Sequence, residues 1–309
     1  MSFTWFIAKR IIGNRKHNSS VSGPIISIGI IAIALGVITM LIALGTGVGL
    51  KNEIGKKVAA FSGHIRLTAL GNSQHQQTLK PLDNAIAYQN QLHQLPNTLA
   101  VQSVAYVPGV ILNNTAFDGI IYKGIDENFN TNFFSFFGIA DTIALPTKND
   151  IWISSELAKK LTLKVGDRVP IYFASSQTSM PKRRSCTIIG LFDTGFADYD
   201  KTYVLGHLDI IRSLYGWDKN QVGAFEIFLN DDTNLDFDTN NIYDSINAIV
   251  DVKHVEDQFP EIFSWIKLFG TNISLIIIIM IIVGGVNMIT ALLVLILEQT
   301  QLIGITRVL

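Results

Sequence analysis

The chain has 309 residues, of which 48% are hydrophobic and only 16% are charged, and its formal net charge is -1. This balance offers no basic surface to a phosphate backbone and therefore excludes nucleic-acid binding. The single cysteine, Cys186, excludes an internal disulfide and a cysteine-rich metal site. Because Cys186 opens the apolar run of residues 186–192, it is typical of a small side chain that fills a core.

Two uncharged apolar runs, residues 25–50 and 268–297, bracket a long polar segment. Each run is longer than the ~20 residues with which a helix crosses a ~30 Å hydrocarbon core. The alternative, a core helix of a soluble protein, would rarely continue so far without a charge. The fold class is therefore predicted to be a membrane protein, in which two transmembrane α-helices flank a large α+β extracytoplasmic domain.

Charge near the N-terminus orients the chain. Before residue 17 the sequence carries Lys9, Arg10, Arg15 and Lys16 and no acidic residue, so the positive-inside rule places both termini in the cytoplasm. A signal peptide is a poorer interpretation, because the apolar run is too long and no cleavage site follows it. Residues 3–12 mix aromatic and aliphatic side chains with cations, which suits either a short helix at the headgroup boundary or an ordinary juxtamembrane start.

These features divide the chain into consecutive parts. We predict a cytoplasmic amphipathic elbow (1–20), a first transmembrane helix (21–50), an extracytoplasmic α+β domain (51–262), a second transmembrane helix (263–297) and a cytoplasmic end segment (298–309). The polar residues that follow Leu50 indicate that the first helix continues out of the bilayer.

Helical and strand periodicities alternate along the polar segment. Strands are predicted over residues 64–70, 101–107, 119–125, 169–174, 186–192, 202–205 and 224–229. Helices are predicted over residues 85–95, 155–161 and 207–215. Ser154 or Ser155 can cap the second of these helices, and Ile242, Ile246 and Ile249 mark a further amphipathic helix.

The loop of residues 175–185 joins two of the predicted strands. Met180 and Pro181 would offer stiff apolar contact at its tip, and three consecutive cations, residues 182–184, follow them. The loop is either an ordinary solvated hairpin connection or a protruding arm that pairs with an acidic partner surface.

Catalytic and metal-binding motifs are incomplete in this sequence. Residues 49–57 resemble a phosphate loop, but Lys57 stands where Ser or Thr must bind magnesium. Residues 232–238 alternate like a calcium loop that lacks its turn glycine and its final glutamate. The apolar runs contain no ionisable group, which excludes an ion-coupled transporter. We therefore predict no catalytic or metal site, and any transport must be powered by another protein.

Short segments through nearly the whole chain carry a family resemblance. In chain order they are residues 6–10 (FIAKR), 26–37 (ISIGIIAIALGV), 123–126 (KGID), 156–161 (ELAKKL), 165–167 (VGD), 188–190 (IIG), Trp265, Asn287 and 298–305 (EQTQLIGI). Their order and spacing resemble the permease subunits of lipoprotein-releasing ABC transporters, the LolC/LolE family. This family lies within a superfamily that includes MacB-like efflux and FtsX-like cell-division permeases.

The resemblance implies a permease in the bacterial inner membrane, with cytoplasmic termini and a periplasmic core domain. Such a permease extracts lipoproteins from the inner membrane for delivery toward the outer membrane. The implied partners are a cytoplasmic ABC ATPase subunit, a second permease chain of the same or a homologous kind, lipoprotein cargo, a periplasmic lipoprotein carrier and membrane lipids. ATP and magnesium would be cofactors of the partner ATPase, and this chain would hold none.

The resemblance also implies functional residues. The family's hook, which recruits the carrier, would comprise Ser176, Gln177, Met180, Pro181, Lys182, Arg183 and Arg184. The segment that couples to the ATPase would present Glu298, Gly304 and Arg307. Acyl chains would enter a cavity at the outer ends of the spans, lined by Met40, Leu44, Val48, Phe263, Ile266 and Phe269, although any one of these could instead face lipid or pack between helices.

Two departures from the family pattern leave alternatives open. Family permeases have four spans, whereas this sequence stops after the second, as a fragment or a shortened gene product would. The hook is also short. The alternatives are a MacB- or FtsX-like efflux or mechanotransmission permease and a two-span membrane sensor. A sensor would require a cytoplasmic output domain, for which residues 298–309 are too few.

Overall fold

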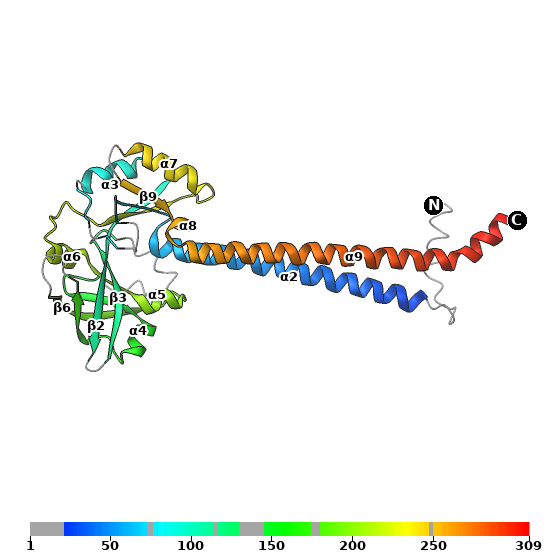
Figure 1. Ribbon diagram of the computed structural model, residues 1–309, viewed down its shortest axis with the longest axis horizontal. Coiled ribbons are helices and arrows are strands. Elements are labelled where there is room, and N and C mark those ends of the chain that lie inside the picture. Colours follow the sequence, from blue (N-terminus) through cyan, green and yellow to red (C-terminus); the bar gives the residue numbers. More distant parts are fainter. Residues whose placement is uncertain are drawn as a thin grey trace. The chain divides into compact units, whose positions relative to one another are not determined.

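The computed structural model describes residues 22–72, 77–78, 80–83, 85–113, 116–129, 145–174, 180–246 and 250–308 (Figure 1). The chain divides into two compact units. The helical unit contains the residues up to Asn52 and from Ser264 onward, and the sheet unit contains Glu53–Phe263. The elbow predicted for residues 1–20 lies outside the described residues.

The helical unit is built on two long helices, α2 (Ser22–Ser62) and α9 (Pro260–Val308). Their segments Ser27–Ser62 and Pro260–Thr290 have mean hydropathies of 2.7 and 2.6 and are long enough to cross a membrane. This confirms the prediction of two apolar helices that flank the polar segment. Helix α2 also continues past Leu50 as predicted, and residues 49–57 therefore form helix and not a phosphate loop. Residues 298–308 form the last turns of α9.

The sheet unit contains strands and short helices in alternation. The strands are β1 (Ile65–Ala69), β2 (Thr98–Asn113), β3 (Ala116–Ile125), β4 (Asp150–Ser154), β5 (Arg168–Phe173), β6 (Lys182–Phe192), β7 (Tyr203–His207), β8 (Ala224–Leu229) and β9 (Val250–His254). The helices are α3 (Ala85–His93), α4 (Ser155–Lys160), α5 (Ala197–Thr202), α6 (Leu208–Tyr215), α7 (Leu235–Ser245) and α8 (Val255–Gln258).

The long strand β2 joins two parts of one sheet. The strand order is β3-β7-β4-β6-β5-β2-β8-β1-β9, and β3 also pairs with β2. The strands from β3 to β2 therefore close into a ring, while β8, β1 and β9 extend from the other end of β2. Figure 1 shows β2 and β3 running side by side between these two regions. Closure removes exposed edges from the ring, and β9 remains an edge strand.

Pro108 and Gly109 explain why the prediction for β2 was too short. The sequence places the end of this strand at Val107, yet β2 continues to Asn113. Residues 98–104 of β2 pair with β8, and Gly109–Ile111 pair with β5. Pro108 lies where β2 changes partner on that edge, so its missing N–H removes no ladder hydrogen bond there.

Local sequence signals explain where several of the helices begin and end. The Ser154 hydroxyl accepts a hydrogen bond from the Leu157 amide at 2.9 Å and so caps α4, as predicted. Gly216, with φ of 71°, ends α6 in the left-handed region that glycine adopts without strain. The helix marked by isoleucines was predicted to reach Ile249, which was too long, because α7 ends at Ser245 with Ile246 as its C-cap. Strands β4 and β9 were not predicted.

Cys186 lies in the core, as its sequence context predicted. Its exposed fraction is 0%, and burial raises the pKa of its thiol from 9.0 to about 11. Since the thiolate is the reactive form, a rise of two pKa units lowers the reactive fraction about 100-fold near pH 8. We expect maleimide to react with Cys186 at least about 100-fold more slowly in the native chain than in urea, measured by mass spectrometry. Equal rates in both states would contradict the buried position.

A cluster of ionisable side chains lies inside the sheet unit, and we call Arg66, Tyr106, Lys123 and Glu226 the polar cluster. Lys123 and Glu226 have fully buried side chains, with 2.9 Å between Nζ and Oε2. Lys123 Nζ also donates to the carbonyl of Phe61, and the Tyr106 hydroxyl donates to Glu226 Oε1. Burial lowers the pKa of Lys123, and the neighbouring carboxylate opposes that shift. Two buried cations therefore share one carboxylate.

Candidate functional site

The predicted arm is the connection between β5 and β6. These strands pair in antiparallel register from Arg168 opposite Thr187 to Phe173 opposite Lys182. The predicted hook residues Ser176 and Gln177 lie outside the described residues. Met180 is 80% exposed, and Pro181 and Arg183 are also exposed.

Two of the three predicted hook cations hold the base of the arm. Lys182 Nζ donates to the carbonyl of Leu214, and Arg184 Nη2 lies 3.4 Å from the Ser213 hydroxyl, both on α6. The Tyr215 hydroxyl donates to the carbonyl of Ala174 at 2.9 Å. Helix α6 thus binds both ends of the connection, and Arg183 is the cation that faces outward.

A basic hollow lies beside the base of the arm. Its volume is about 520 Å³. It is lined by Lys148, Asn149, Arg184, Asp209, Ile210, Arg212, Ser213, Gly216, Trp217 and Lys219. The lining holds four cations and one carboxylate, that of Asp209. We call this site the basic hollow. The sequence does not reveal this hollow, because its cations come from segments far apart in the chain and only Arg184 belongs to a run of cations.

Asp209 organises the cations of the basic hollow. Its Oδ1 accepts a hydrogen bond from Arg212 Nη1 at 3.0 Å, and Lys148 Nζ lies 3.9 Å from its Oδ2. Burial favours the protonated acid, but the Arg212 hydrogen bond and the nearby cations prevail and lower the pKa of Asp209. Asp209 is therefore ionised at neutral pH, and the lining retains an excess of positive charge for an acidic partner.

A second hollow of about 180 Å³ lies between α2 and α9 in the helical unit. It is lined by Ala32, Ile33, Gly36, Val37, Met40, Met280, Ile281, Val283, Gly284 and Asn287. Apart from the Asn287 amide, the residues of this lining are glycines or have apolar side chains. Small residues at Gly36 and Gly284 leave room between the helices, which is common where transmembrane helices pack closely.

Of the six residues predicted to line an acyl cavity, Met40 is the one that lines a hollow in the described part of the helical unit, the hollow of about 180 Å³. Phe269 lies beside Gly47 and stacks on Trp265, with ring centroids 5.6 Å apart. Phe263 packs against a core cluster of the sheet unit. The remaining three differ in exposure: Leu44 is partly buried, Val48 is 56% exposed and Ile266 is 6% exposed.

The remaining predicted positions fall in helices. Glu298, Gly304 and Arg307, the predicted coupling residues, lie in the last turns of α9. Near the imperfect calcium-loop pattern, Asp238 accepts a hydrogen bond from Asn97 at 2.8 Å, and Asp236 pairs with His254 at 3.3 Å. These acids thus contact neighbouring side chains of the sheet unit.

Comparison with known proteins agrees with this architecture. Residues 27–262 match the family described as MacB-like periplasmic core domain. The chain is 21% identical over 315 residues to the lipoprotein-releasing system transmembrane protein LolC of Xylella fastidiosa strain Temecula1 / ATCC 700964. Its identity to LolC of Xylella fastidiosa strain 9a5c is 22%. Each alignment covers 98% of this chain and 72% of the relative.

Two solved structures are also similar. The extracellular domain of the noncanonic ABC-type transporter YknZ from Gram-positive bacteria matches with 15% identity and a TM-score of 0.40, over 62% of this chain and 99% of that one. The periplasmic region of MacB from Actinobacillus actinomycetemcomitans matches with 12% identity and a TM-score of 0.41, over 64% of this chain and 91% of that one.

The family match begins near the start of α2, runs through the sheet unit and ends at residue 262, in the first turn of α9. The LolC relatives extend this similarity to both apolar helices, which the structure also contains. The sensor alternative has no support in these comparisons. The chain belongs to the family of ABC transporter permeases that carry the MacB-like periplasmic core domain.

Proposed function

We propose that this permease extracts lipoproteins from the inner membrane and passes them to a soluble periplasmic carrier. The observation that carries the proposal is the similarity to LolC, a lipoprotein-releasing protein by name, over 98% of this chain. In this proposal the termini are cytoplasmic and the sheet unit is periplasmic. A second permease chain completes the membrane assembly, and a cytoplasmic ATPase with ATP and magnesium supplies the energy.

The apolar hollow between α2 and α9 supports a lipid-handling role. Transfer of an acyl chain out of the bilayer costs about 0.8 kcal/mol for each methylene that meets water. An apolar lining such as that around Met40 and Met280 lowers this cost while the chain leaves the membrane. The ATPase acts on the end of α9 that carries Glu298, Gly304 and Arg307, and the movement brings paired spans together and drives the acyl chains outward.

The arm and the basic hollow support carrier docking. Exposed Met180 offers an apolar contact, and Arg183 and Lys219 add positive charge around it. A carrier with an acidic rim around an apolar mouth would match this pattern, because complementary charge steers and orients association.

Reconstitution tests the proposed function directly. The chain would be inserted into proteoliposomes with its cognate ATPase, partner permease and an acylated lipoprotein, and release to added carrier would be scored. ATP-dependent release is expected. ATP hydrolysis without release would overturn lipoprotein extraction and favour the efflux or mechanotransmission alternative.

Charge reversal on the arm tests carrier docking. Replacing residues 182–184 together with Glu would also remove the bonds by which Lys182 and Arg184 hold the arm to α6. The sharper variant is therefore Arg183→Glu with Lys219→Glu. We expect it to weaken carrier binding about tenfold or more, measured by surface plasmon resonance, because two favourable rim charges become repulsive.

The matched control is Lys159→Glu with Lys164→Glu, which reverses two exposed cations outside the arm and the basic hollow. Its carrier affinity should equal that of the unmodified chain. An equal loss of carrier affinity in both variants would indicate a general effect of net charge and not a docking contact. Unchanged affinity in the arm variant would leave the connection as an ordinary hairpin.

A further inference from the structure

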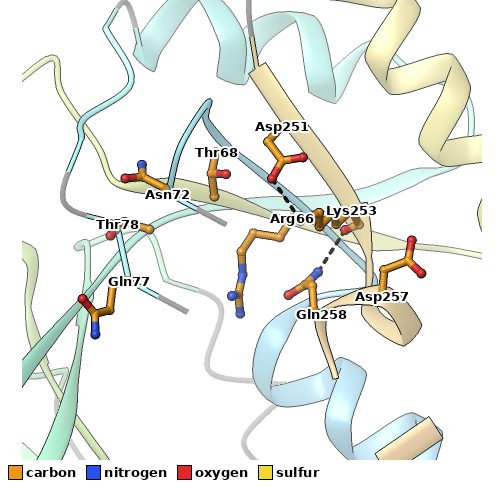
Figure 2. A pocket seen from close by; sticks show the side chains of 9 residues that line it. All are labelled: Arg66, Thr68, Asn72, Gln77, Thr78, Asp251, Lys253, Asp257 and Gln258. Carbon is orange, nitrogen blue, oxygen red and sulfur yellow. Dashed lines mark hydrogen bonds and ion pairs between the residues drawn. The ribbon is translucent and has the colours of Figure 1, made fainter. Parts of the chain in front are cut away.

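A small hollow of about 60 Å³ lies on the sheet unit where β1 and β9 pair (Figure 2), and it shares no lining residue with the basic hollow. Its lining combines β1 and the turn that follows it, residues 77–78, and the segment from β9 into α8. The lining residues are Arg66, Thr68, Asn72, Gln77, Thr78, Asp251, Lys253, Asp257 and Gln258. Every lining residue except Gln77 and Thr78 lies on β1, β9 or α8 or in the turn that follows β1.

Arg66 is the buried cation of this hollow. The register of β1 places it directly between Glu226 on β8 and Lys253 on β9. The residue is only 6% exposed. Its Nη2 donates to the Tyr106 hydroxyl at 3.3 Å, but Nε has no acceptor among the residues that the structure describes. Figure 2 shows its guanidinium extending between the segment that carries Gln77 and the helix that carries Gln258.

The carboxylates near Arg66 have other partners. Glu226 pairs with Lys123 and accepts from Tyr106. At the hollow itself, Asp251 pairs with Lys253 at 3.3 Å, and Asp257 pairs with His254 at 3.1 Å. Among the residues that the structure describes, no carboxylate forms an ion pair with Arg66, and Glu226, which attracts its charge from β8, is shared with Lys123. A buried cation without a full counter-charge is costly, so an anion in the hollow would be stabilised.

Gln258 narrows the choice of anion. Its Nε2 donates to the carbonyl of Lys253 at 2.9 Å, which fixes the amide orientation. Its buried Oε1 then has no donor among the described residues. A ligand that satisfies both sites must accept from Arg66 and donate to Gln258. A phosphate group with one protonated oxygen does both, whereas sulfate and carboxylate ions lack the donor at neutral pH. Inorganic phosphate keeps such a proton at neutral pH, and a phosphomonoester, with a second pKa of about 6, would bind as its singly protonated form.

We infer that the sheet unit binds a single phosphate group at Arg66, either as free phosphate or as a phosphomonoester. A volume of 60 Å³ admits a group of this size and leaves the rest of a larger ligand outside. Arg66 neutralises the anion, and Gln258 recognises its remaining proton. This site is independent of lipoprotein extraction and of the arm.

Equilibrium dialysis of the full chain in detergent against radiolabelled inorganic phosphate tests the inference. Saturable binding of one phosphate per chain is expected, with sulfate a weaker competitor. Arg66→Met should weaken binding about tenfold or more, because it removes the cation while Lys123 and Glu226 still balance each other. Arg183→Met removes an equivalent charge from the exposed arm and should bind phosphate normally.

Gln258→Leu provides a second variant that keeps every buried charge. It should weaken phosphate binding and abolish the preference for phosphate over sulfate. Slow maleimide labelling of Cys186 would verify the fold of each variant. If short-chain phosphatidic acid competes with inorganic phosphate, the bound phosphate group comes from a lipid headgroup. If it does not compete, the ligand is free phosphate. Failure to bind phosphate at millimolar concentration, or undiminished binding by folded Arg66→Met, would overturn the inference.

Discussion

Glu226→Gln is expected to lower the free energy of unfolding of the sheet unit by about 3–5 kcal/mol. The side chain of Glu226 is 0% exposed and is the counter-charge for Lys123 at 2.9 Å. Glutamine preserves the shape and can still accept from Tyr106, but it leaves two buried cations without a carboxylate. The measurement is urea unfolding of the full chain in detergent, followed by pulsed maleimide labelling of Cys186.

Two further variants separate lost charge pairing from lost packing. Glu256→Gln makes the same chemical change at an exposed position on α8 and should leave the unfolding midpoint unchanged. Adding Lys123→Met to Glu226→Gln should recover part of the lost stability, because it removes one stranded cation. The loss in free energy of unfolding in the double variant is compared with the summed losses of Glu226→Gln and Lys123→Met. If the double variant loses more than that sum, charge pairing is not the main contribution of Glu226 to stability.

The sequence predicted those parts of the fold that depend on local pattern. The apolar runs predicted α2 and α9, the predicted cap at Ser154 agrees with the start of α4, and the helix predicted to end at Tyr215 agrees with the end of α6. Strand β9 was not predicted because its alternating run, VDVK, is only four residues long, which is the shortest run that indicates a strand. Its pairing with β1 is a contact between residues far apart in the chain, which periodicity does not report.

The candidate sites were less predictable because each assembles distant residues. The arm was visible as a run of cations, but the sequence could not show that Lys182 and Arg184 are tied to α6. The basic hollow also needs Lys148, Arg212 and Lys219. Lys123 gave a usable signal, since it is the only charge in the apolar strand of residues 119–125, yet its partner lies 103 positions away.

Close packing of α2 on α9 at Gly47 leads to a second large expected effect. Gly47 is buried, and a Cβ atom added there would overlap Cδ1 of Ile273 and lie 3.8 Å from Phe269. Gly47→Leu should therefore push the helices apart by about 2 Å, since the separation of packed helices follows the size of the side chains between them. Spin labels at exposed Leu41 and Leu275 would report this change by pulsed electron resonance.

The same helix supplies matched controls. A Cβ atom added at Gly45 or Gly49 meets no atom within 4 Å, so Gly45→Leu and Gly49→Leu should leave the distance between the labels unchanged. Cys186 is buried and would not take up the label in the native chain. If the 180 Å³ hollow admits acyl chains, Gly47→Leu should also reduce lipoprotein release while both controls retain it. An unchanged distance in Gly47→Leu would show that α2 and α9 do not depend on close contact at this glycine.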